Sequence, residues 1–153
     1  MPSPGSSPLL FGDLLARARL SWVRQMSARL GQLGYEDYRR TDAIVCRILL
    51  RGPVPIGRLG TALGVTRQAA RKITEDLAQR SYVTVVRSSE DARRLEAELT
   101  PAGQAYAHAV VRVIGDLNRA LTKRVDAAQL EAAGAVLNAV ISLGHAAAQP
   151  TSR

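Results

Sequence analysis

The stretch SSEDARRLEAELTPAG, residues 88–103, joins a charged loop, an alternating segment and a helix start within sixteen positions. In the segment RLEAELT, residues 94–100, apolar and polar side chains alternate with the two-residue period that is typical of a β-strand. The preceding segment YVTVVR, residues 82–87, has the same period, and the polar SSEDAR lies between the two. Together they predict an antiparallel hairpin, which is the only β structure that the sequence predicts convincingly.

Two helices are predicted after the hairpin. Thr100 can cap the first of them, because Pro101 fits a first helical turn, where a missing N–H group is not needed. The apolar positions of this helix are Tyr106, Val110, Val113, Ile114, Leu117 and Leu121. Asp126 and Gln129 form a capping pair for a final helix. The apolar positions of that helix are Leu130, Ala133, Val136, Leu137, Val140 and Ile141.

Two short helices are predicted before the hairpin. The segment AIVCRILL, residues 43–50, is almost wholly apolar and should form a central helix with Thr41 or Asp42 as its cap. The segment VPIGRLGTALG that follows predicts a helix of one to three turns, started by Pro55 and stopped by its last glycine.

A tight turn after Gly64 leads to a third helix in this region. Thr66 is expected to cap the segment RQAARKITEDLAQR. Its buried stripe should consist of Ala69, Ala70, Ile73 and Leu77. Four polar side chains are then left to face outward from the first two turns, namely Arg67, Gln68, Arg71 and Lys72.

A long helix is predicted at the start of the chain, from Leu10 to Gly31 or Gly34. Its apolar positions are Leu14, Leu15, Ala18, Trp22, Val23, Met26, Leu30 and Leu33. This stripe is too wide for an isolated surface helix, so the helix should pack against a partner.

The order of helix, helix, turn, helix and hairpin from residue 42 to 99 is that of a winged helix-turn-helix. The predicted fold class is therefore mainly α, with a three-helix core plus a β-hairpin wing and with further helices at both ends. A helix fits the major groove of DNA and must present donors and acceptors from its N-terminal turns. The positive end of its dipole also approaches phosphate there.

The third helix of this core carries the candidate base-reading residues. Arginine can grip guanine O6 and N7, and glutamine can grip adenine N6 and N7. The candidate DNA-binding residues of this helix are Thr66, Arg67, Gln68, Arg71 and Lys72. The alternative is that they are ordinary solvent-facing residues of an amphipathic helix, and the helix alone does not decide between the two.

The hairpin loop favours the DNA-binding interpretation, because a projecting two-stranded ribbon can reach a neighbouring minor groove. Arginine is attracted to the negative potential of a narrow minor groove, and a nearby carboxylate can hold its guanidinium in place. Asp91 lies beside Arg93 and Arg94, and Arg87 adds charge at the base of the loop. We therefore predict wing contacts to DNA from these three arginines, with Asp91 as the carboxylate that pairs with Arg93 or Arg94.

Composition narrows the function classes. The 153 residues carry a formal net charge of +8, which suits a polyanionic partner, although a basic composition alone is equally compatible with an ordinary soluble protein. Cys46 is the single cysteine, so an intrachain disulfide framework and a multi-cysteine metal site are excluded. No stretch approaches the roughly 18 uninterrupted apolar residues of a membrane span. We expect a soluble cytoplasmic protein without a cofactor.

From about Tyr35 to Gly103 the chain resembles the multiple-antibiotic-resistance regulator (MarR) family of bacterial winged-helix transcription factors. The strongest match is D-x-R followed by L-T-x-x-G, formed by Asp91, Arg93, Leu99, Thr100 and Gly103. The stretch ALGVTRQAARKITEDL is similar to the recognition-helix region of the family. The resemblance implies that Asp91 orients Arg93, that Arg93 enters the minor groove and that the recognition helix contacts the major groove.

The family layout implies the organisation of the whole chain. Residues 1–8 and 148–153 are expected to be tails, and residues 41–99 the DNA-binding domain. Residues 9–40 and 100–147 would supply helices for a homodimer. The resemblance further implies a repressor that binds a pseudo-palindromic operator on double-stranded DNA. Such a protein would be located in the bacterial cytoplasm and associated with the nucleoid. The resemblance also implies a small-molecule effector. Candidate linings of the effector pocket are Trp22, Met26, Tyr35 and Tyr38, although residues of these types are more often part of the core.

Two positions depart from the family pattern. Ser81 stands where the family usually has glycine before the first wing strand, so this helix end must accommodate a side chain. The thiol-based sensors of the family have their reactive cysteine in the first helix, whereas Cys46 lies in an apolar helix and is interpreted as a small buried hydrophobe. Redox sensing is therefore disfavoured.

The sequence gives less support to two other function classes. An enzyme is disfavoured because His108 and His145, the only histidines, show no metal-ligand spacing and no evident catalytic partner. A protein-interaction module that kept the winged-helix fold without DNA binding would predict an acidic or apolar recognition surface. The basic residues named above oppose it, but the net charge of this region is reduced by Glu75, Asp76, Glu90 and Glu96, so this alternative stays open.

Overall fold

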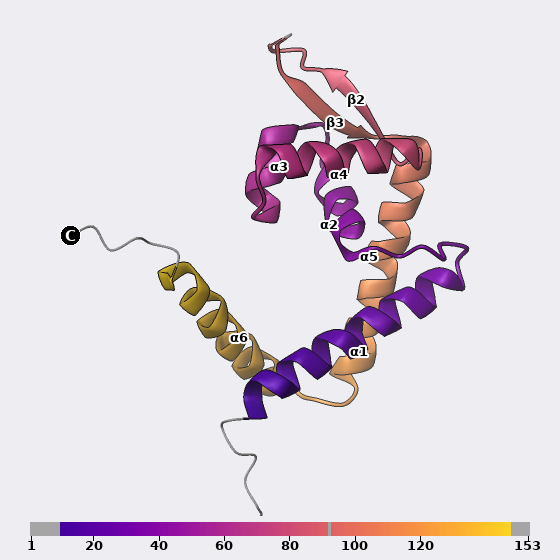
Figure 1. Ribbon diagram of the computed structural model, residues 1–153. Helices are drawn as coiled ribbons and strands as arrows, with labels where there is room; N and C mark the ends of the chain where they lie inside the picture. The colour runs from indigo at the N-terminus through magenta and orange to yellow at the C-terminus, as the bar shows by residue number, and fades with distance from the viewer. Residues whose placement is uncertain (1–9, 92, 148–153) are drawn as a thin grey trace, which may run out of the picture. The chain divides into compact units, whose positions relative to one another are not determined.

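The computed structural model describes residues 10–91 and 93–147, with side chains as far as residue 143. The tails expected at residues 1–8 and 148–153 lie outside the described residues. The chain divides into two units, one up to Ile114 and one from Gly115 onward, and each is described by itself. The elements in chain order are α1 (Phe11–Gly31), α2 (Arg40–Leu49), β1 (Val54–Pro55), α3 (Ile56–Leu63), α4 (Arg67–Gln79), β2 (Val83–Arg87), β3 (Leu95–Leu99), α5 (Pro101–Thr122) and α6 (Ala127–Ala147) (Figure 1). This order confirms the predicted mainly helical class with a winged helix-turn-helix.

The turn between α3 and α4 follows the prediction closely. Gly64 adopts the left-handed conformation, with φ of 67°, and ends α3. The Thr66 side chain then accepts a hydrogen bond of 3.2 Å from the Ala69 N–H and caps α4. Gly64, which ends α3, and Thr66, which caps α4, are only two positions apart, so the two helices are joined by a tight turn.

The hairpin is confirmed, but the sheet has a third strand that the sequence analysis missed. Strands β2 and β3 pair antiparallel with Val83 opposite Leu99. The two-residue strand β1 pairs with the other edge of β3, placing Val54 opposite Ala97. Pro55 is the N-cap of α3 and not a first-turn residue, which corrects the prediction. Proline suits an edge strand because it has no N–H group to donate to a neighbour.

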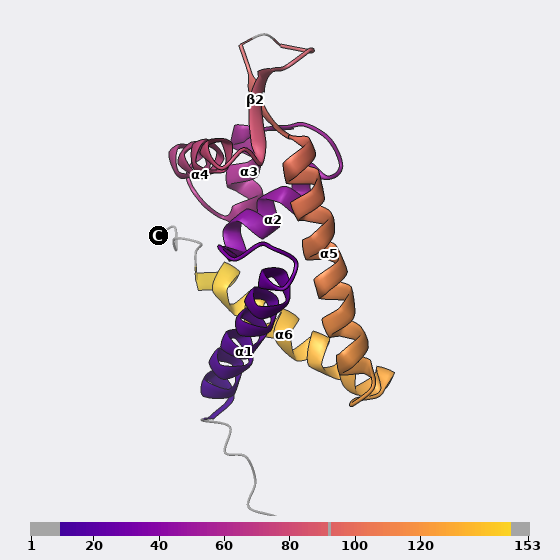
Figure 2. The same ribbon diagram turned by 90° about the vertical axis from the view of Figure 1, so that its right-hand side faces the viewer.

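The end of the hairpin extends beyond the helices. In both views the ribbon of β2 and β3 continues past α3 and α4 to the connecting loop (Figures 1 and 2). A loop in this position is able to reach a surface beside the one that α4 contacts.

The start of α2 differs from the prediction. The N-cap is Arg39, whose side chain forms no capping hydrogen bond, so the expected caps Thr41 and Asp42 lie inside the first turn. Asp42 is buried, with 5% of its surface exposed, and its carboxylate forms an ion pair with Arg80 just after α4. This long-range partner, which the local pattern could not reveal, ties α2 to the end of α4.

The helix end at Ser81 carries the strain expected of a serine in a glycine position. The Ser81 N–H bonds to the Ala78 carbonyl at 2.9 Å, and the Tyr82 N–H bonds to the Leu77 carbonyl at 3.0 Å, which is the Schellman pattern. Ser81 has a φ of 62°, the one positive value for a non-glycine residue in the described part of the chain. A side chain in this conformation is unfavourable.

Replacing Ser81 by glycine is therefore expected to stabilise the protein. The gain should be about 0.5–1 kcal/mol, since relief of the left-handed conformation is partly offset by the greater freedom of glycine in the unfolded chain. Urea unfolding monitored by circular dichroism measures this difference. Ser81→Ala is the matched control and should bring no gain, because alanine keeps the Cβ atom. A glycine variant no more stable than the alanine variant would contradict the strain.

Tyr106 and Cys46 belong to the core of the first unit, and two half-buried tyrosines pack against Tyr106. The Tyr106 ring stacks on Tyr82, with ring centroids 4.8 Å apart, and makes a tilted contact with Tyr35 at 5.1 Å. Cys46 is fully buried, and this burial raises the pKa of its thiol to about 12, with Asp42 adding to the shift. The burial of Cys46 confirms the prediction that it is a small buried hydrophobe. A thiol that stays protonated is also a poor nucleophile, because only the thiolate is nucleophilic.

The second unit contains the end of α5 and the whole of α6. Asp126 and Gln129 exchange hydrogen bonds of 2.8 and 3.0 Å between each side chain and the other residue's N–H, as predicted for a capping pair. Among the described residues, no helix combines the length and the apolar character that crossing a membrane requires.

Candidate nucleic-acid interface

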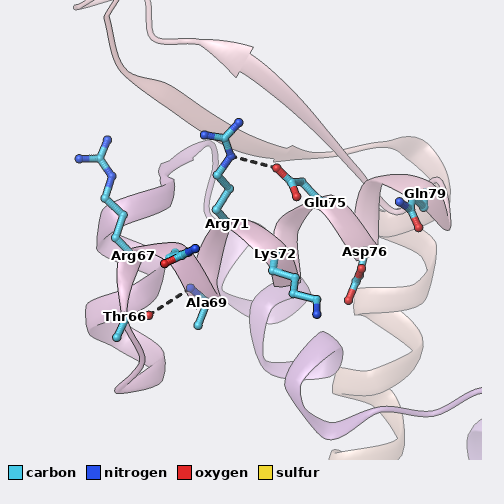
Figure 3. Close-up of a pocket in the computed structure, with 9 residues that line it drawn as sticks. Thr66, Arg67, Ala69, Arg71, Lys72, Glu75, Asp76 and Gln79 are labelled. Atoms are coloured by element: carbon cyan, nitrogen blue, oxygen red, sulfur yellow. Dashed lines mark hydrogen bonds and ion pairs between the residues drawn. The ribbon is translucent and has the colours of Figure 1, made fainter.

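The outer face of α4 is a polar surface that begins at the helix N-terminus. The five predicted recognition-helix residues are all exposed and line one continuous hollow with Glu75, Asp76 and Gln79 (Figure 3). The opposite face of the helix is buried through Ala70, Thr74 and Leu77. The core therefore holds the helix in place while the predicted side chains remain free to meet a partner.

Charge is distributed unevenly along this face. The first two turns contain Arg67, Arg71 and Lys72, whereas Glu75 and Asp76 follow in the next turn. Arg71 Nε lies 2.9 Å from Glu75 Oε1, and both side chains are more than half exposed (Figure 3). Such an exposed pair contributes little to stability, so a nucleic-acid base can compete for the arginine. The positive end of the helix dipole coincides with the basic end of the face.

The wing loop is organised by Asp91, which contacts both Arg93 and Arg94. Asp91 Oδ1 accepts a hydrogen bond of 3.0 Å from the main-chain N–H of Arg93, while Oδ2 lies 3.3 Å from Arg94 Nε. Asp91 thus holds the main chain of Arg93 and pairs with the side chain of Arg94, and its role in orienting Arg93 stays a prediction. The Arg94 N–H also donates to the Asp91 carbonyl at 2.8 Å, so the turn keeps Arg94 close to this aspartate.

The remaining wing arginines are exposed. Arg93 keeps an exposed side chain on the loop, and its main chain is fixed by Asp91. Arg87 ends β2, opposite Leu95 in the sheet, and is also exposed. The structure therefore places every predicted wing arginine at the surface of the hairpin.

A separate cavity of about 300 Å³ lies within the first unit, between α1, α2 and the first part of α5. Three of the four candidate effector linings, Trp22, Met26 and Tyr38, border it. Tyr35 does not border it and packs on Tyr106 instead. The pattern of the sequence could not separate these residues, because it does not reveal which side chains of α1 and of the connection to α2 meet in the folded chain.

The charged residues of this cavity are all arginines. Arg19, Arg40 and Arg47 line it, and no carboxylate does. Burial raises the pKa of the Tyr38 hydroxyl, although Arg40 and Arg47 act in the opposite direction. Tyr38 is therefore a neutral hydrogen-bond donor near pH 7, and the cavity offers aromatic walls together with positive charge.

The histidines do not form a site that the structure can describe. His108 is exposed on α5, and the side chain of His145 lies outside the described residues. Within residues 10–91 and 93–143, no group of three or more His, Cys, Asp or Glu side chains is arranged to hold a metal ion.

The fold of the chain is shared with solved structures, although its sequence has no close match among known proteins. The chain matches no family model and none of the curated proteins. It is similar in structure to FabT of Streptococcus pneumoniae in complex with DNA, with a TM-score of 0.76, 16% identity, and coverage of 88% of this chain and 94% of that one. It is also similar to a mutant MarR of E. coli complexed with operator DNA, with a TM-score of 0.71, 20% identity, and coverage of 91% and 99%.

A third similar structure is that of the transcriptional regulator PcaV from Streptomyces coelicolor in complex with its natural ligand. The TM-score is 0.71 and the identity 17%, over 93% of this chain and 98% of that one. Agreement over nearly the whole length, at such low identity, is an agreement of fold. The chain has the winged-helix fold of the MarR-type transcriptional regulators.

Proposed function

We propose that the protein is a transcriptional regulator that binds a pseudo-palindromic site on double-stranded DNA as a homodimer. One observation carries the proposal: a capped helix held by the core presents an exposed basic N-terminal half beside a projecting hairpin. A helix of this kind suits the major groove, and an arginine-bearing loop suits the adjacent minor groove.

The residues of the candidate interface have different expected roles. Gln68 and Arg71 present groups for base edges, and Lys72 offers a point charge for the phosphate backbone. Arg93 is expected to enter the minor groove, with Asp91 holding the main chain beneath it. Thr66 contributes by capping the helix whose first turn approaches the DNA.

The apolar surfaces of the terminal helices support a homodimer. On α1 and its N-cap the exposed large apolar residues are Leu10, Phe11, Leu14, Leu20 and Trp22. On α6 they are Val136, Leu137, Ile141 and Leu143, the last with 72% of its surface exposed. A second copy would remove these surfaces from water. Analytical ultracentrifugation of the purified protein tests this, and a monomer at micromolar concentration would contradict it.

DNA binding itself is tested with the region upstream of the protein's own gene. We expect fluorescence anisotropy to show binding that weakens steeply with salt, because phosphate neutralisation releases counterions. Footprinting should then reveal two half-sites about one helical turn apart. Absence of binding at low salt to this region and to genomic fragments would favour the alternative of a protein-interaction module.

The wing role of Arg93 is tested by Arg93→Ala. We expect DNA affinity to fall by about 1–3 kcal/mol, which is the scale of one groove contact. Arg112→Ala is the control, because Arg112 is exposed on α5 and lines neither the α4 surface nor the cavity. If both variants bind the footprinted duplex as the unmodified protein does, Arg93 has no such role.

The proposed mode of regulation is repression, relieved by a small aromatic anion in the cavity between α1, α2 and α5. Its arginines and aromatic walls support this choice of ligand. Such a ligand changes DNA affinity only if it binds one conformation more tightly than the other.

Trp22 makes the effector hypothesis measurable, because it is the single tryptophan and borders the cavity. Titration with a panel of small aromatic carboxylates should change its fluorescence saturably for at least one member. Arg47→Ala should weaken that binding about tenfold, the effect of losing one charge-assisted hydrogen bond. Arg112→Ala should leave it unchanged. Equal affinities of the two variants would place the ligand elsewhere.

A further inference from the structure

A second small cavity, of about 230 Å³, lies beside the recognition helix and contains a cluster of arginines. The lining residues are Pro55, Ile56, Gly57, Arg58, Arg67, Arg94 and Leu95. Three of these are arginines from three different segments: α3, the first turn of α4 and the loop that leads into β3. No carboxylate lines this three-arginine cavity.

The three-stranded sheet brings these segments together. Pairing of β1 with β3 places Pro55 opposite Glu96, so the start of α3 lies beside the start of β3. Arg94 immediately precedes β3, and the tight turn after α3 returns the chain so that Arg67 begins α4. The site therefore depends on a strand pairing between residues about 40 positions apart, which the sequence pattern did not predict.

The electrostatics of this cavity favour an anion. Arg94 is held by Asp91 through Nε, whereas Arg58 and Arg67 form no ion pair within the described part of the chain. Helix α3 has no side-chain cap and no acidic residue in its own first turn, so no residue of this turn neutralises the positive end of its dipole. Three guanidinium groups repel one another unless an anion lies between them.

The location indicates which anion. The sugar-phosphate backbone separates the major groove from the minor groove, so a protein with a helix in one and a hairpin loop in the other must straddle a backbone. The three-arginine cavity lies between these two elements, at the start of α4 and the base of the hairpin loop. Arginine forks also match the oxygens of a phosphate group.

We propose that the three-arginine cavity binds one phosphate of the DNA backbone in each half-site, with Arg58 as a DNA-contacting residue outside the recognition helix. This inference rests on the proposed function and extends it. Arg67 then contacts the backbone from the first turn of α4, which leaves base reading to Gln68 and Arg71. The contact fixes the position of the protein on the duplex without selecting a sequence.

The test uses Arg58→Ala, because Arg58 is exposed and lies on α3, outside the helix that carries the predicted base-reading side chains. Loss of one neutralised phosphate should lower the slope of log K against log salt by about 0.9 for each bound protomer, and weaken binding about eightfold per protomer at 0.1 M salt. The loss should be the same for the footprinted duplex and a scrambled one. Arg58→Lys should keep the slope, and Arg112→Ala is the matched control.

A chemical change in the DNA locates the contact. Methylphosphonate is introduced at one backbone position at a time in the footprinted duplex, which removes one charge. We expect one position per half-site where the change weakens the unmodified protein but not Arg58→Ala. If no position shows this dependence, or if Arg58→Ala keeps the original slope, the inference is wrong.

Two further results separate this inference from its alternatives. If the unmodified protein binds no DNA, the proposed function fails together with the inference. If it binds DNA with an unchanged slope in Arg58→Ala, only the inference fails. Inorganic phosphate is titrated into the free protein, and binding is followed by NMR. Saturation below about 1 mM that is lost in Arg58→Ala, together with unchanged DNA binding by this variant, would identify a site for free phosphate. This result would overturn the backbone assignment.

Discussion

Gly103→Ala is expected to lower the free energy of unfolding by about 3 kcal/mol, at the upper end of the cost of overpacking a core. A Cβ atom at Gly103 would lie 1.9 Å from the Tyr82 carbonyl oxygen and 3.0 Å from Leu99 Cδ2. The Tyr82 carbonyl cannot yield easily, because it accepts a hydrogen bond of 3.1 Å from the Thr100 N–H. To remove the clash, α5 must move away from the start of the hairpin.

Urea unfolding followed by circular dichroism measures this effect. The matched control is Gly115→Ala in the same helix, where the nearest atom is the flexible end of Arg119 at 3.4 Å. That variant should be as stable as the original protein or up to about 1 kcal/mol more stable, since alanine is the better helix former. Similar stabilities of the two variants would show that the hairpin and α5 do not approach as closely as described.

The same close approach gives physical meaning to the glycine of the L-T-x-x-G motif. Thr100 Oγ1 donates to the Ser81 carbonyl at 2.6 Å and accepts from the Gly103 N–H at 3.0 Å. Thr100 thus caps α5 and at the same time ties it to the segment that follows the recognition helix. Gly103 allows this contact because it has no side chain, so the motif positions the wing relative to α5.

Asp42→Ala is expected to have the second large effect, a loss of about 3 kcal/mol in the free energy of unfolding. The Asp42 carboxylate is the buried partner of Arg80, whose side chain is only 24% exposed. Removing the carboxylate leaves a largely buried guanidinium with Asp37 Oδ2, 3.9 Å away, as its remaining acidic neighbour among the described residues. A buried charge without its partner is strongly destabilising.

A double-mutant cycle separates the ion pair from simple loss of packing. Combining Asp42→Ala with Arg80→Met should recover part of the stability, because no charge is then left buried. Asp37→Ala is the control and should cost less than about 1 kcal/mol, as expected for an exposed carboxylate. Strictly additive losses from Asp42→Ala and Arg80→Met would show that the pair is not coupled. DNA binding by the single variant should weaken as well, because the pair anchors the end of α4.

Much of the fold was predictable because the signals are local. The left-handed Gly64, the Thr66 cap and the capping pair of Asp126 with Gln129 depend on residues within three or four positions of one another. The alternation of apolar and polar residues likewise revealed the hairpin without knowledge of any partner. The recognition-helix residues could be named for the same reason: helical periodicity decides which side chains face outward.

The candidate sites were less predictable, because they depend on contacts between distant positions. The sequence alone determined the helices, the hairpin and the exposure of the basic residues on α4. Only the tertiary structure decided that Asp42 meets Arg80, that Asp91 pairs with Arg94 and that β1 brings Arg58 beside the wing. The physical reason is that a periodic pattern specifies which face of an element is buried, whereas the partner of that face is chosen by packing across the whole unit.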